Sequence, residues 1–576
     1  MAMSPSDTPF APRSSTFMAK GELMCSTVNV GHGAWRFILV APLSLSGRRA
    51  AKKVHKNGDG FAEGIPNIAP HLQTPRLRSQ PTSRPIHRYM FTSCHQGYLL
   101  LTMAKALANM PQVSQHDIPT ARPAPIIALP TEVLTEIFKT YVESYPDKGA
   151  VDLCLVGKCW NAVANATPQL WTNIRFSFPF TSGHLIRVLK RVRASKLQKI
   201  DVLIDFRDPS SPGGDEPEYD EGENLRCTNE SVWVQGIMTV LKNTEERWKS
   251  IKIVSDTWLP LHRLMDHWKF THLPSLESIL MERDNNASGA RDARFEPQEL
   301  AGPMTLFGRN ASLPKLRELS LFAAHVDWND ASVCYQNLRK LEIKNQTYDV
   351  GPTFEQFAAI LASSPRLEYL DVSGFCPEDH TEPAPPPGGA PKIPIVRLPA
   401  LKDFVFGWKD PDTGCPFLRM FQIGDSLESL TLMDTESGFG DLENWRSCRI
   451  WGQESQAIFE TLYELGSAAP GGKDGMPSGP FISMRGVKRL KIAWTKTTRF
   501  SLTPFLMALT EVEDIWLEDV KRTVLEDVVR AAVSRAAVSR PLRRLDLRWR
   551  WQNGIPRSAG PFILRMKDLG VEVTAR

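Results

Sequence analysis

The stretch Leu313-Pro-Lys-Leu-Arg-Glu-Leu-Ser-Leu321 carries the pattern that decides the fold. Apolar residues occupy positions 1, 4 and 6 of this pattern, here Leu316, Leu319 and Leu321. Positions 4 and 6 are two residues apart, which is the period of a strand with one buried face, and a preceding turn supplies position 1. The pattern occurs in eleven copies, which begin at Leu197, Trp248, Leu276, Leu316, Leu338, Leu367, Leu401, Leu427, Val487, Val512 and Leu542. The copies predict a long series of strands.

Helices are expected between strands where the chain leaves room for them. Phe354, Phe357 and Ile360 recur at helical spacing before Pro365, and the apolar residues of 524–533 do the same before Pro541. Many copies begin 22 to 30 residues after the previous one, for example 22 residues from Leu316 to Leu338. The predicted unit is therefore strand, loop and helix.

This unit resembles the leucine-rich repeat, whose period is about 20–29 residues. The resemblance implies an α/β solenoid, and an unrelated α/β fold with amphipathic strands is the alternative. The ninth position departs from the family pattern, which usually has Asn or Cys there to bond the backbone at the turn. It holds Asp284, Ala324, Gln346, Phe375 and Thr435. We therefore expect no side-chain ladder at the turns and an irregular solenoid.

Charge is unevenly distributed over the 576 residues, of which 42% are apolar. The net charge is +5, but residues 1–120 hold 13 Lys/Arg against 5 Asp/Glu, so the remainder carries −3. The bulk of the chain is therefore not a cationic nucleic-acid binder. Residues 1–120 are rich in Ser, Pro and Arg and lack sustained periodicity, which predicts a disordered basic arm.

The nine cysteines are an odd number, are widely spread and form no C-x-x-C pair. This usage predicts a reduced protein in the cytoplasm, the nucleus or both, without a disulfide framework or a zinc site. The longest apolar stretches, 37–45 and 98–104, are shorter than the roughly 20 residues of a membrane-spanning helix. We expect neither a membrane partner nor a secretory route.

The segment from Ile126 to Trp171 predicts a compact group of short helices. Pro130 suits the first position of a helix, and apolar residues then recur from Val133 to Tyr141 at helical spacing. A second helix is expected to place Leu153, Val156, Trp160 and Val163 on one face. Gly157 weakens that helix by about 1 kcal/mol relative to a good helix former.

Three phrases in this segment, Leu129-Pro-Thr-Glu-Val-Leu-Thr-Glu-Ile-Phe138, Leu155-Val-Gly-Lys-Cys-Trp160 and Thr167-Pro-Gln-Leu-Trp171, resemble the F-box, especially in its fungal form. The resemblance implies a short three-helix module that docks on a Skp-type adaptor and thereby joins a cullin-based ubiquitin ligase. C-terminal repeats select the substrate in that family. The expected domains are the arm 1–120, an F-box 121–180 and a leucine-rich-repeat-like solenoid 181–576, with inserts near 208–223, 377–394 and 466–480.

The resemblance also assigns roles to single residues. It implies that an adaptor surface is formed by Leu129, Pro130, Val133, Leu134, Ile137 and Phe138. Leu155, Val156 and Trp160 match positions that mainly hold the module together, with some adaptor contact, as does Trp171. The alternative is that Leu134, Ile137 and Phe138 are simply core residues, because a module of three short helices needs some of them inside.

No nucleotide-binding, nucleophile-elbow or zinc-protease motif occurs, so we expect a non-catalytic protein with no cofactor, no metal and no catalytic residue. His262, His267 and His272 do not share a helical face and are expected at the surface. The basic cluster Arg543, Arg544, Arg548 and Arg550 favours solvent-facing strand positions over a nucleic-acid site.

Two functions remain open. The first is a substrate-recognition adaptor of a Skp-cullin-F-box ubiquitin ligase. The second is a leucine-rich-repeat scaffold with a ligase-independent F-box interaction. The sequence does not identify the protein substrate, which would meet exposed strand positions such as Glu318, Ser320, Lys340, Glu342, Tyr369, Asp371, Ser429 and Thr431.

Overall fold

In the computed structural model the chain divides into two units, Met1–Gln115 and His116–Arg576, and the described residues belong to the second. They are residues 129–575 except 147, 208–221, 270–271, 284–293, 308–312, 331–334, 378–392, 436–453, 468–479, 496–501, 539–540 and 550–556. The predicted arm 1–120 and most of the three predicted inserts lie outside the described residues, so these assignments stay predictions.

Three short helices follow Pro130, and we call residues 129–171 the helical module. They are α2 (Thr131–Ser144), α3 (Gly149–Val156) and α4 (Lys158–Ala166), followed by the 3-10 turn η1 (Pro168–Trp171). Pro130 precedes the first helical residue instead of occupying it. The module has its own apolar cluster, separate from that of the following sheet, and the Trp171 indole donates to the Ala164 carbonyl at 2.9 Å.

The single second helix expected in the module is wrong. The backbone of Gly157 is extended, with φ 172° and ψ 171°, and it separates α3 from α4. Glycine is a poor helix former, so a change of direction costs little there. The break leaves the C-terminal end of α3, with Leu155 and Val156, in solvent.

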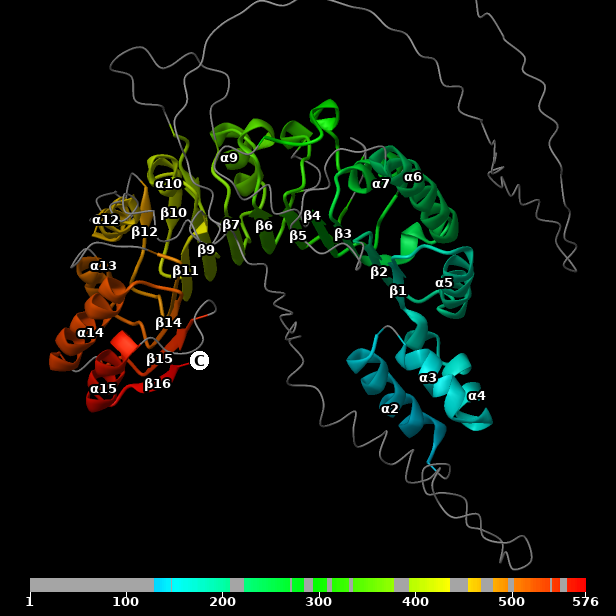
Figure 1. Ribbon diagram of the computed structural model, residues 1–576, viewed down its shortest axis with the longest axis horizontal. Helices are drawn as coiled ribbons and strands as arrows, with labels where there is room; N and C mark the ends of the chain where they lie inside the picture. The colour runs from blue at the N-terminus through cyan, green and yellow to red at the C-terminus, as the bar shows by residue number, and fades with distance from the viewer. Residues whose placement is uncertain are drawn as a thin grey trace, which may run out of the picture. The chain divides into compact units, whose positions relative to one another are not determined.

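A 13-stranded sheet forms the rest of the described unit, and every neighbouring pair of its strands is parallel (Figure 1). Its strands, in spatial order, are β1 (Asn173–Ser177), β2 (Ile200–Asp205), β3 (Trp248–Ser255), β4 (Ser278–Arg283), β5 (Glu318–Phe322), β6 (Lys340–Lys344), β7 (Tyr369–Ser373), β9 (Asp403–Trp408), β11 (Ser429–Asp434), β13 (Arg489–Ala493), β14 (Asp514–Glu518), β15 (Arg544–Arg548) and β16 (Glu572–Ala575). A second sheet of three short strands has the order β12 (Phe481–Ile482), β10 (Phe421–Ile423) and β8 (Val396–Arg397).

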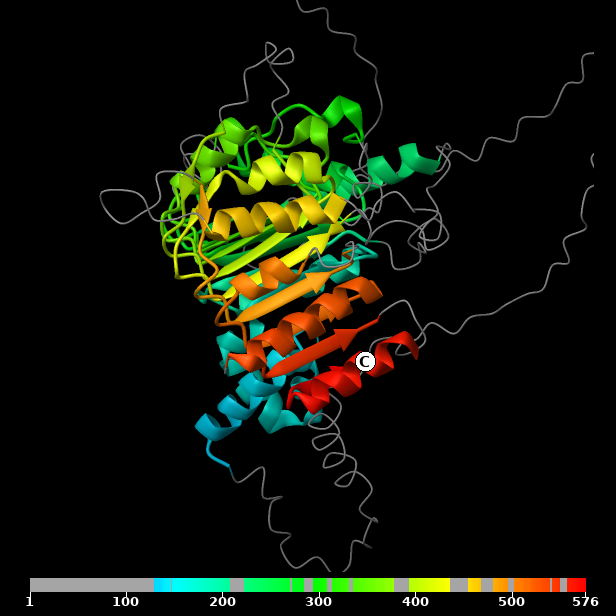
Figure 2. The same ribbon diagram turned by 90° about the vertical axis from the view of Figure 1, so that its left-hand side faces the viewer.

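Helices connect the parallel strands and cover one face of the large sheet (Figures 1 and 2). They are α5 (Ser182–Ala194), α6 (Gly222–Leu241), α7 (Leu259–Trp268), α9 (Phe354–Ala362), α10 (Pro411–Leu418), α12 (Glu454–Ser467), α13 (Thr503–Ala508), α14 (Arg522–Ala537) and α15 (Gly560–Asp568). Short 3-10 turns are η2 (Glu245–Arg247), η4 (Gln298–Leu300), η5 (Trp328–Asp330), η6 (Tyr348–Val350) and η8 (Arg557–Ala559). We call the opposite side of the sheet the helix-free face, because none of the described helices covers it.

The register of the sheet aligns the predicted copies. Leu319 of β5 pairs with Leu341 of β6, and Leu321 pairs with Ile343, so positions 4 and 6 form continuous buried rows. The fold is therefore a mixed α/β fold with a large parallel sheet built from a repeated unit. Leu197 is an exception, because it is 90% exposed although the other position-1 residues are buried.

The loop that contains Leu197 is held by a polar side chain. The Arg247 guanidinium donates to the carbonyls of Lys196 and Gln198 and to the Ser195 hydroxyl. These bonds fix the loop without an inward-pointing leucine.

The turns after five strands share one backbone conformation. Their first residues have φ between 47° and 65° and are Ala323, Asn345, Gly374, Trp494 and Asp519. Each donates its N–H to a carbonyl at the end of the next strand or one residue before it, as Asn345 does to Ser373 and Gly374 does to Gly407. A backbone ladder thus replaces the side-chain ladder that leucine-rich repeats use.

At the ninth position of the repeat, the expected loss of side-chain bonding holds at Ala324 and Phe375, which are buried apolar residues. It is wrong at Thr435, whose hydroxyl donates to the Trp408 carbonyl at 2.8 Å, and at Gln346, whose amide donates to the Lys344 carbonyl at 3.4 Å. Asp284 lies outside the described residues.

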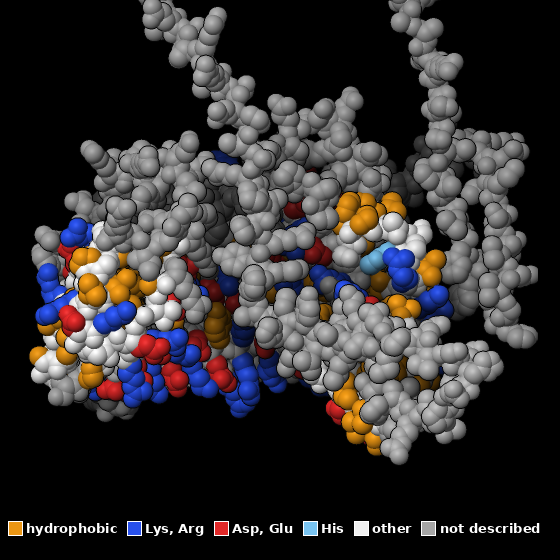
Figure 3. Space-filling view, turned by 60° about the horizontal axis from the view of Figure 1, so that its bottom comes forward, with side chains coloured by type: hydrophobic (Ala, Val, Ile, Leu, Met, Phe, Trp, Pro, Cys, Tyr) orange, Lys and Arg blue, Asp and Glu red, His pale blue; other side chains and the backbone are white. Residues whose placement is uncertain are grey.

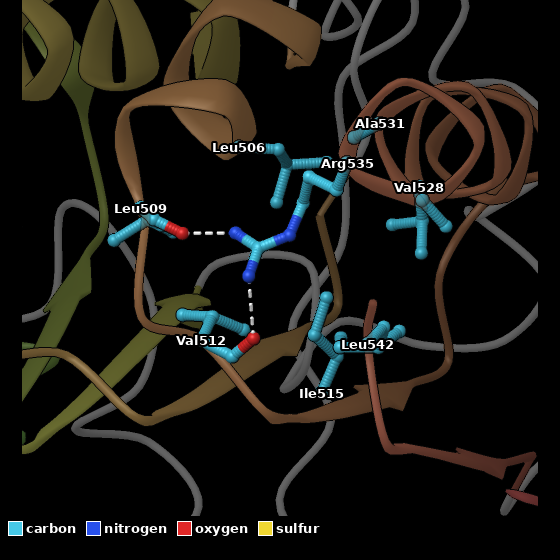
Figure 4. A pocket seen from close by; sticks show the side chains of 9 residues that line it. Leu506, Leu509, Val512, Ile515, Val528, Ala531, Arg535 and Leu542 are labelled. Atoms are coloured by element: carbon cyan, nitrogen blue, oxygen red, sulfur yellow. Dashed lines mark hydrogen bonds between the residues drawn. The ribbon is translucent and has the colours of Figure 1, made fainter. Parts of the chain in front are cut away.

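A buried arginine closes the core between α13 and α14 (Figure 4). Arg535 points into a pocket otherwise lined by apolar side chains and donates to the carbonyls of Val512 at 2.7 Å, Thr510 at 3.2 Å and Leu509. These bonds satisfy the backbone of the turn that leads from α13 to β14, so the side chain has a structural role.

Candidate functional site

The residues predicted to dock an adaptor separate into a buried and an exposed group. Leu134 and Phe138 are 1% and 0% exposed and lie in the core of the helical module. Leu129, Ile137 and Trp160 are half-buried and pack against the same cluster. The exposed members are Pro130, Val133, Leu155 and Val156.

Leu134 and Phe138 are core residues of the module, as the alternative expects, and their contact with an adaptor stays a prediction. Both side chains lie on the face of α2 that packs on the other helices, since they are four residues apart. The ring of Phe138 lies 4.9 Å from that of Trp160, centroid to centroid, at an interplanar angle of 50°. This contact joins α2 to α4.

For Leu155 and Val156, the expected role in holding the module together is wrong. Leu155 is 77% exposed and Val156 is 55% exposed. The connection between α2 and α3 is short, so α3 returns along α2. This return is supported by the close approach of Gly149 to Val142.

Several apolar side chains of α2 and α3 are exposed to solvent. We call Val133, Val151, Leu155 and Val156 the docking patch; Val133 is 44% exposed and Val151 is 46% exposed. Val151 was missed by the sequence reasoning. The available signal was its spacing of four residues from Leu155, which places both on one face of α3.

The C-terminal part of α2 packs against α3. Burial raises the pKa of Tyr141, and the neighbouring carboxylate of Asp152 adds to that rise. Burial also raises the pKa of the Cys154 thiol. These groups belong to the packed interior of the module, in contrast to the solvent-facing docking patch.

A second candidate surface is the helix-free face of the sheet. Its side chains form rows across the strands, and the central row contains Arg175, Leu203, Lys252, Leu280, Ser320, Glu342, Asp371, Val405, Thr431, Lys491, Trp516, Asp546 and Thr574. Figure 3 shows Lys and Arg side chains beside Asp and Glu side chains along the lower border of the view. The face is therefore polar and carries both signs of charge.

The middle of this face is an ion-pair network. The Lys344 ammonium lies 2.8 Å from the Asp371 carboxylate and 3.1 Å from that of Glu342, which also accepts from the Ser320 hydroxyl. Glu342 and Asp371, expected to be exposed, are 9% and 4% exposed. Neighbouring side chains cover these two carboxylates, because the ion-paired groups lie side by side on adjacent strands.

The protonation equilibria follow from this arrangement. Burial lowers the pKa of Lys344, but the carboxylates of Asp371 and Glu342 more than offset it, so its pKa is raised. Burial raises the pKa of Asp371 in spite of the opposing charge of Lys344. Lys340 lies 3.3 Å from Glu342, so the network pairs two cations with two carboxylates and presents few free charges to a ligand.

The predicted surface histidines do not converge on a site. His267 and His272 are exposed and His262 is half-buried. Across the described ranges, no group of three His, Cys, Asp or Glu side chains is arranged to hold a metal ion. In the same part of the chain, no helix combines the length and apolar composition needed to cross a membrane.

Comparison with known proteins gives little. No protein-family model matches the chain, and neither does any curated protein. Among solved structures, the chain is similar to the yeast structure titled "Crystal structure of Rad7 and Elc1 complex in yeast", with a TM-score of 0.28 and 11% identity over 84% of this chain and 98% of that one. That TM-score does not establish a shared fold.

The fold and its surfaces define a general class: an α/β protein in which a repeated strand–helix unit builds a large parallel sheet, preceded by a small helical module.

Proposed function

We propose that this protein is a substrate-recognition adaptor of a Skp-cullin-F-box ubiquitin ligase. The helical module binds a Skp-type adaptor and, through it, a cullin. The sheet, as a leucine-rich-repeat-like solenoid, binds a protein substrate. Ubiquitin transfer belongs to the partner enzymes, so this chain is non-catalytic and needs no cofactor. It acts in the cytoplasm, the nucleus or both.

The observation that carries the proposal is the docking patch. It lies in the segment whose three phrases resemble the F-box, and its four side chains are between 44% and 77% exposed. Fully burying an aliphatic side chain of this size is worth about 1.5–3 kcal/mol. Exposed apolar groups on a small helical module favour a partner helix or groove.

The sheet supports the second half of the proposal. Parallel strands in regular register present polar side chains on a face that the described helices leave uncovered. Repeat surfaces of this kind bind through the exposed side chains of successive strands.

The test is co-purification of tagged full-length protein with the Skp-type adaptor and a cullin. The double variant Leu155→Asp/Val156→Asp places charges in the patch without touching the core. It is expected to lose both partners. The matched control is Leu197→Asp, which changes an exposed leucine outside the module.

The outcomes separate the candidate functions. Retention of adaptor and cullin by wild type and by Leu197→Asp, but not by the double variant, supports the proposal. Adaptor without cullin would favour the ligase-independent scaffold instead. A well-folded wild-type protein that retains neither partner contradicts both.

A further inference from the structure

The C-terminal part of the helix-free face differs from its middle. There an aromatic side chain lies among cations of neighbouring strands. Trp516, in the centre of β14, is half-buried. Its register partners in the central row are Lys491 on β13 and Asp546 on β15. Neighbouring strands are about 4.8 Å apart, so these side chains are direct neighbours.

Two cations of this region form ion pairs with buried carboxylates. Lys491 is paired with Glu518 at 2.7 Å, and the side chains are 36% and 2% exposed. Arg548 is paired with Asp546 at 3.2 Å, with exposures of 50% and 3%. The hydrogen bond that Arg548 donates to the Asp546 carboxylate raises the pKa of Arg548. A partner approaching this face therefore meets ammonium and guanidinium groups, while the carboxylates of Glu518 and Asp546 are buried and that of Asp514 is half-buried.

Arg544 adds a donor that is not used inside the protein. It lies on β15 in register with Asp514 and is half-buried. In the described part of the chain its Nε is buried and has no hydrogen-bond partner. An unsatisfied guanidinium donor is costly to bury, and a carboxylate is its best acceptor, because two parallel N–H groups can bind it at once.

We propose that this surface, which consists of Trp516, Lys491, Arg544 and Arg548 and is called here the Trp516 cluster, binds an acidic protein segment. A carboxylate pairs with Arg544, further carboxylates meet Lys491 and Arg548, and an apolar side chain between them packs on Trp516. This inference rests on the proposed function, since it names the class of substrate segment that the sheet recognises.

Charge favours a peptide over a nucleic acid. On β13 to β15 the helix-free face carries the cations Arg489, Lys491, Arg544 and Arg548 and the acids Asp514, Glu518 and Asp546. Four cations against three acids leave a single net positive charge. Nucleic-acid binding depends on neutralising many phosphates, which this balance does not provide.

The test uses a fluorescein-labelled peptide of Glu and Asp around one central Phe, with fluorescence anisotropy on the full chain. A peptide with Gln and Asn in place of the acids is the charge control. Among the described residues Arg544 forms no ion pair, so the fold of Arg544→Gln is expected to be intact. Trp516→Ser removes the aromatic contact. Lys252→Gln changes a half-exposed lysine in the same central row at the other end of the sheet and is the matched control.

We expect salt-sensitive binding of the acidic peptide, weakened about tenfold or more by Arg544→Gln. We expect Trp516→Ser also to weaken binding, and Lys252→Gln to leave it unchanged. Equal binding by wild type and Arg544→Gln, or no preference for the acidic over the amide peptide, overturns the inference. Tighter binding of a single-stranded oligonucleotide than of the peptide overturns it too.

Failure of this inference is distinguishable from failure of the proposed function. A protein that retains the Skp-type adaptor but ignores the acidic peptide contradicts the inference alone. A protein that binds the peptide through Arg544 but retains no adaptor contradicts the proposed function, and leaves the Trp516 cluster as a binding surface.

Discussion

At the scale of the residue, neighbours in the helical module have opposite roles. Phe138 is fully buried against Trp160, whereas Leu155, which lies in the second of the F-box-like phrases, projects into solvent. Substitutions at the two sites therefore test different properties. A change at Phe138 acts on folding of the module, and a change at Leu155 acts on what the module binds.

Phe138→Ala is expected to destabilise the helical module by about 3–5 kcal/mol, because it leaves a cavity in a small core. Amide hydrogen exchange of residues 131–171 measures this, and exchange should accelerate throughout that range. Leu155→Ala is the control and should leave the exchange unchanged. Equal protection in both variants would show that Phe138 does not support the module.

Whether a single side chain faces the core or solvent is the property least predictable from the sequence. Spacing correctly groups Leu134 with Phe138, but it does not say which face of a short helix meets its neighbours. The extended backbone of Gly157 decided this for Leu155 and Val156. A glycine in a helical pattern lowers the expected stability of a helix without giving its new direction.

At the scale of the element, the strand pattern is informative because one face of every strand is buried. All eleven copies correspond to strands of the large sheet, which also contains β1 and β16. Strand β1 does fit the pattern, with Trp171, Ile174 and Phe176 at positions 1, 4 and 6, but Trp171 also ends the third F-box-like phrase, which conceals this copy. Before β16 the first position is Gly570, so no apolar signal marks it.

The recurring turn after the strands is also an element-scale feature. Gly374→Ala is expected to destabilise the protein by about 1–2 kcal/mol from the left-handed backbone alone. Its φ is +65°, and an added Cβ would clash with the Asn345 Oδ1 atom, which adds to the loss. Urea unfolding measures the change.

Gly424→Ala is the matched control for this substitution, because nothing lies within 4 Å of its added Cβ. Equal midpoints for the two variants would argue against a required left-handed turn after β7.

At the scale of the whole molecule, stability is expected to depend on buried histidines. His325 lies among Trp258 and Phe295, with ring centroids 6.3 and 5.4 Å away. Burial lowers the pKa of His325 from its ordinary value of 6.5, and burial is also the largest cause of the lowered pKa of His262 and His184. The charge of Asp349 raises the pKa of His325 and so opposes the effect of burial.

The lowered pKa values make the free energy of unfolding depend on pH. Below pH 6.5 the unfolded chain takes up protons at these histidines before the folded protein does, so the free energy of unfolding falls as the pH falls through that value. Urea unfolding at a series of pH values from about 7 downward measures the slope. His325→Gln should flatten it. An unchanged slope in that variant would exclude His325 as a contributor.

At this scale we propose that the molecule has two binding surfaces for two partners, each on a part of the chain with its own apolar core. The helical module has one core and exposes the docking patch, and the sheet has the other and exposes the Trp516 cluster. The strand repeat was predictable from sequence because it recurs. The Trp516 cluster was not, because only the register of three strands brings Lys491, Trp516 and Arg544 together.

The most direct test of the central claim is amide hydrogen exchange of the full chain with and without a purified Skp-type adaptor. The account predicts slower exchange in peptides that cover residues 131–156, with the strands of the sheet unchanged. Leu155→Asp/Val156→Asp should abolish that protection. Protection confined to the sheet, or no protection in a folded wild-type protein, would contradict the claim that the helical module docks the adaptor.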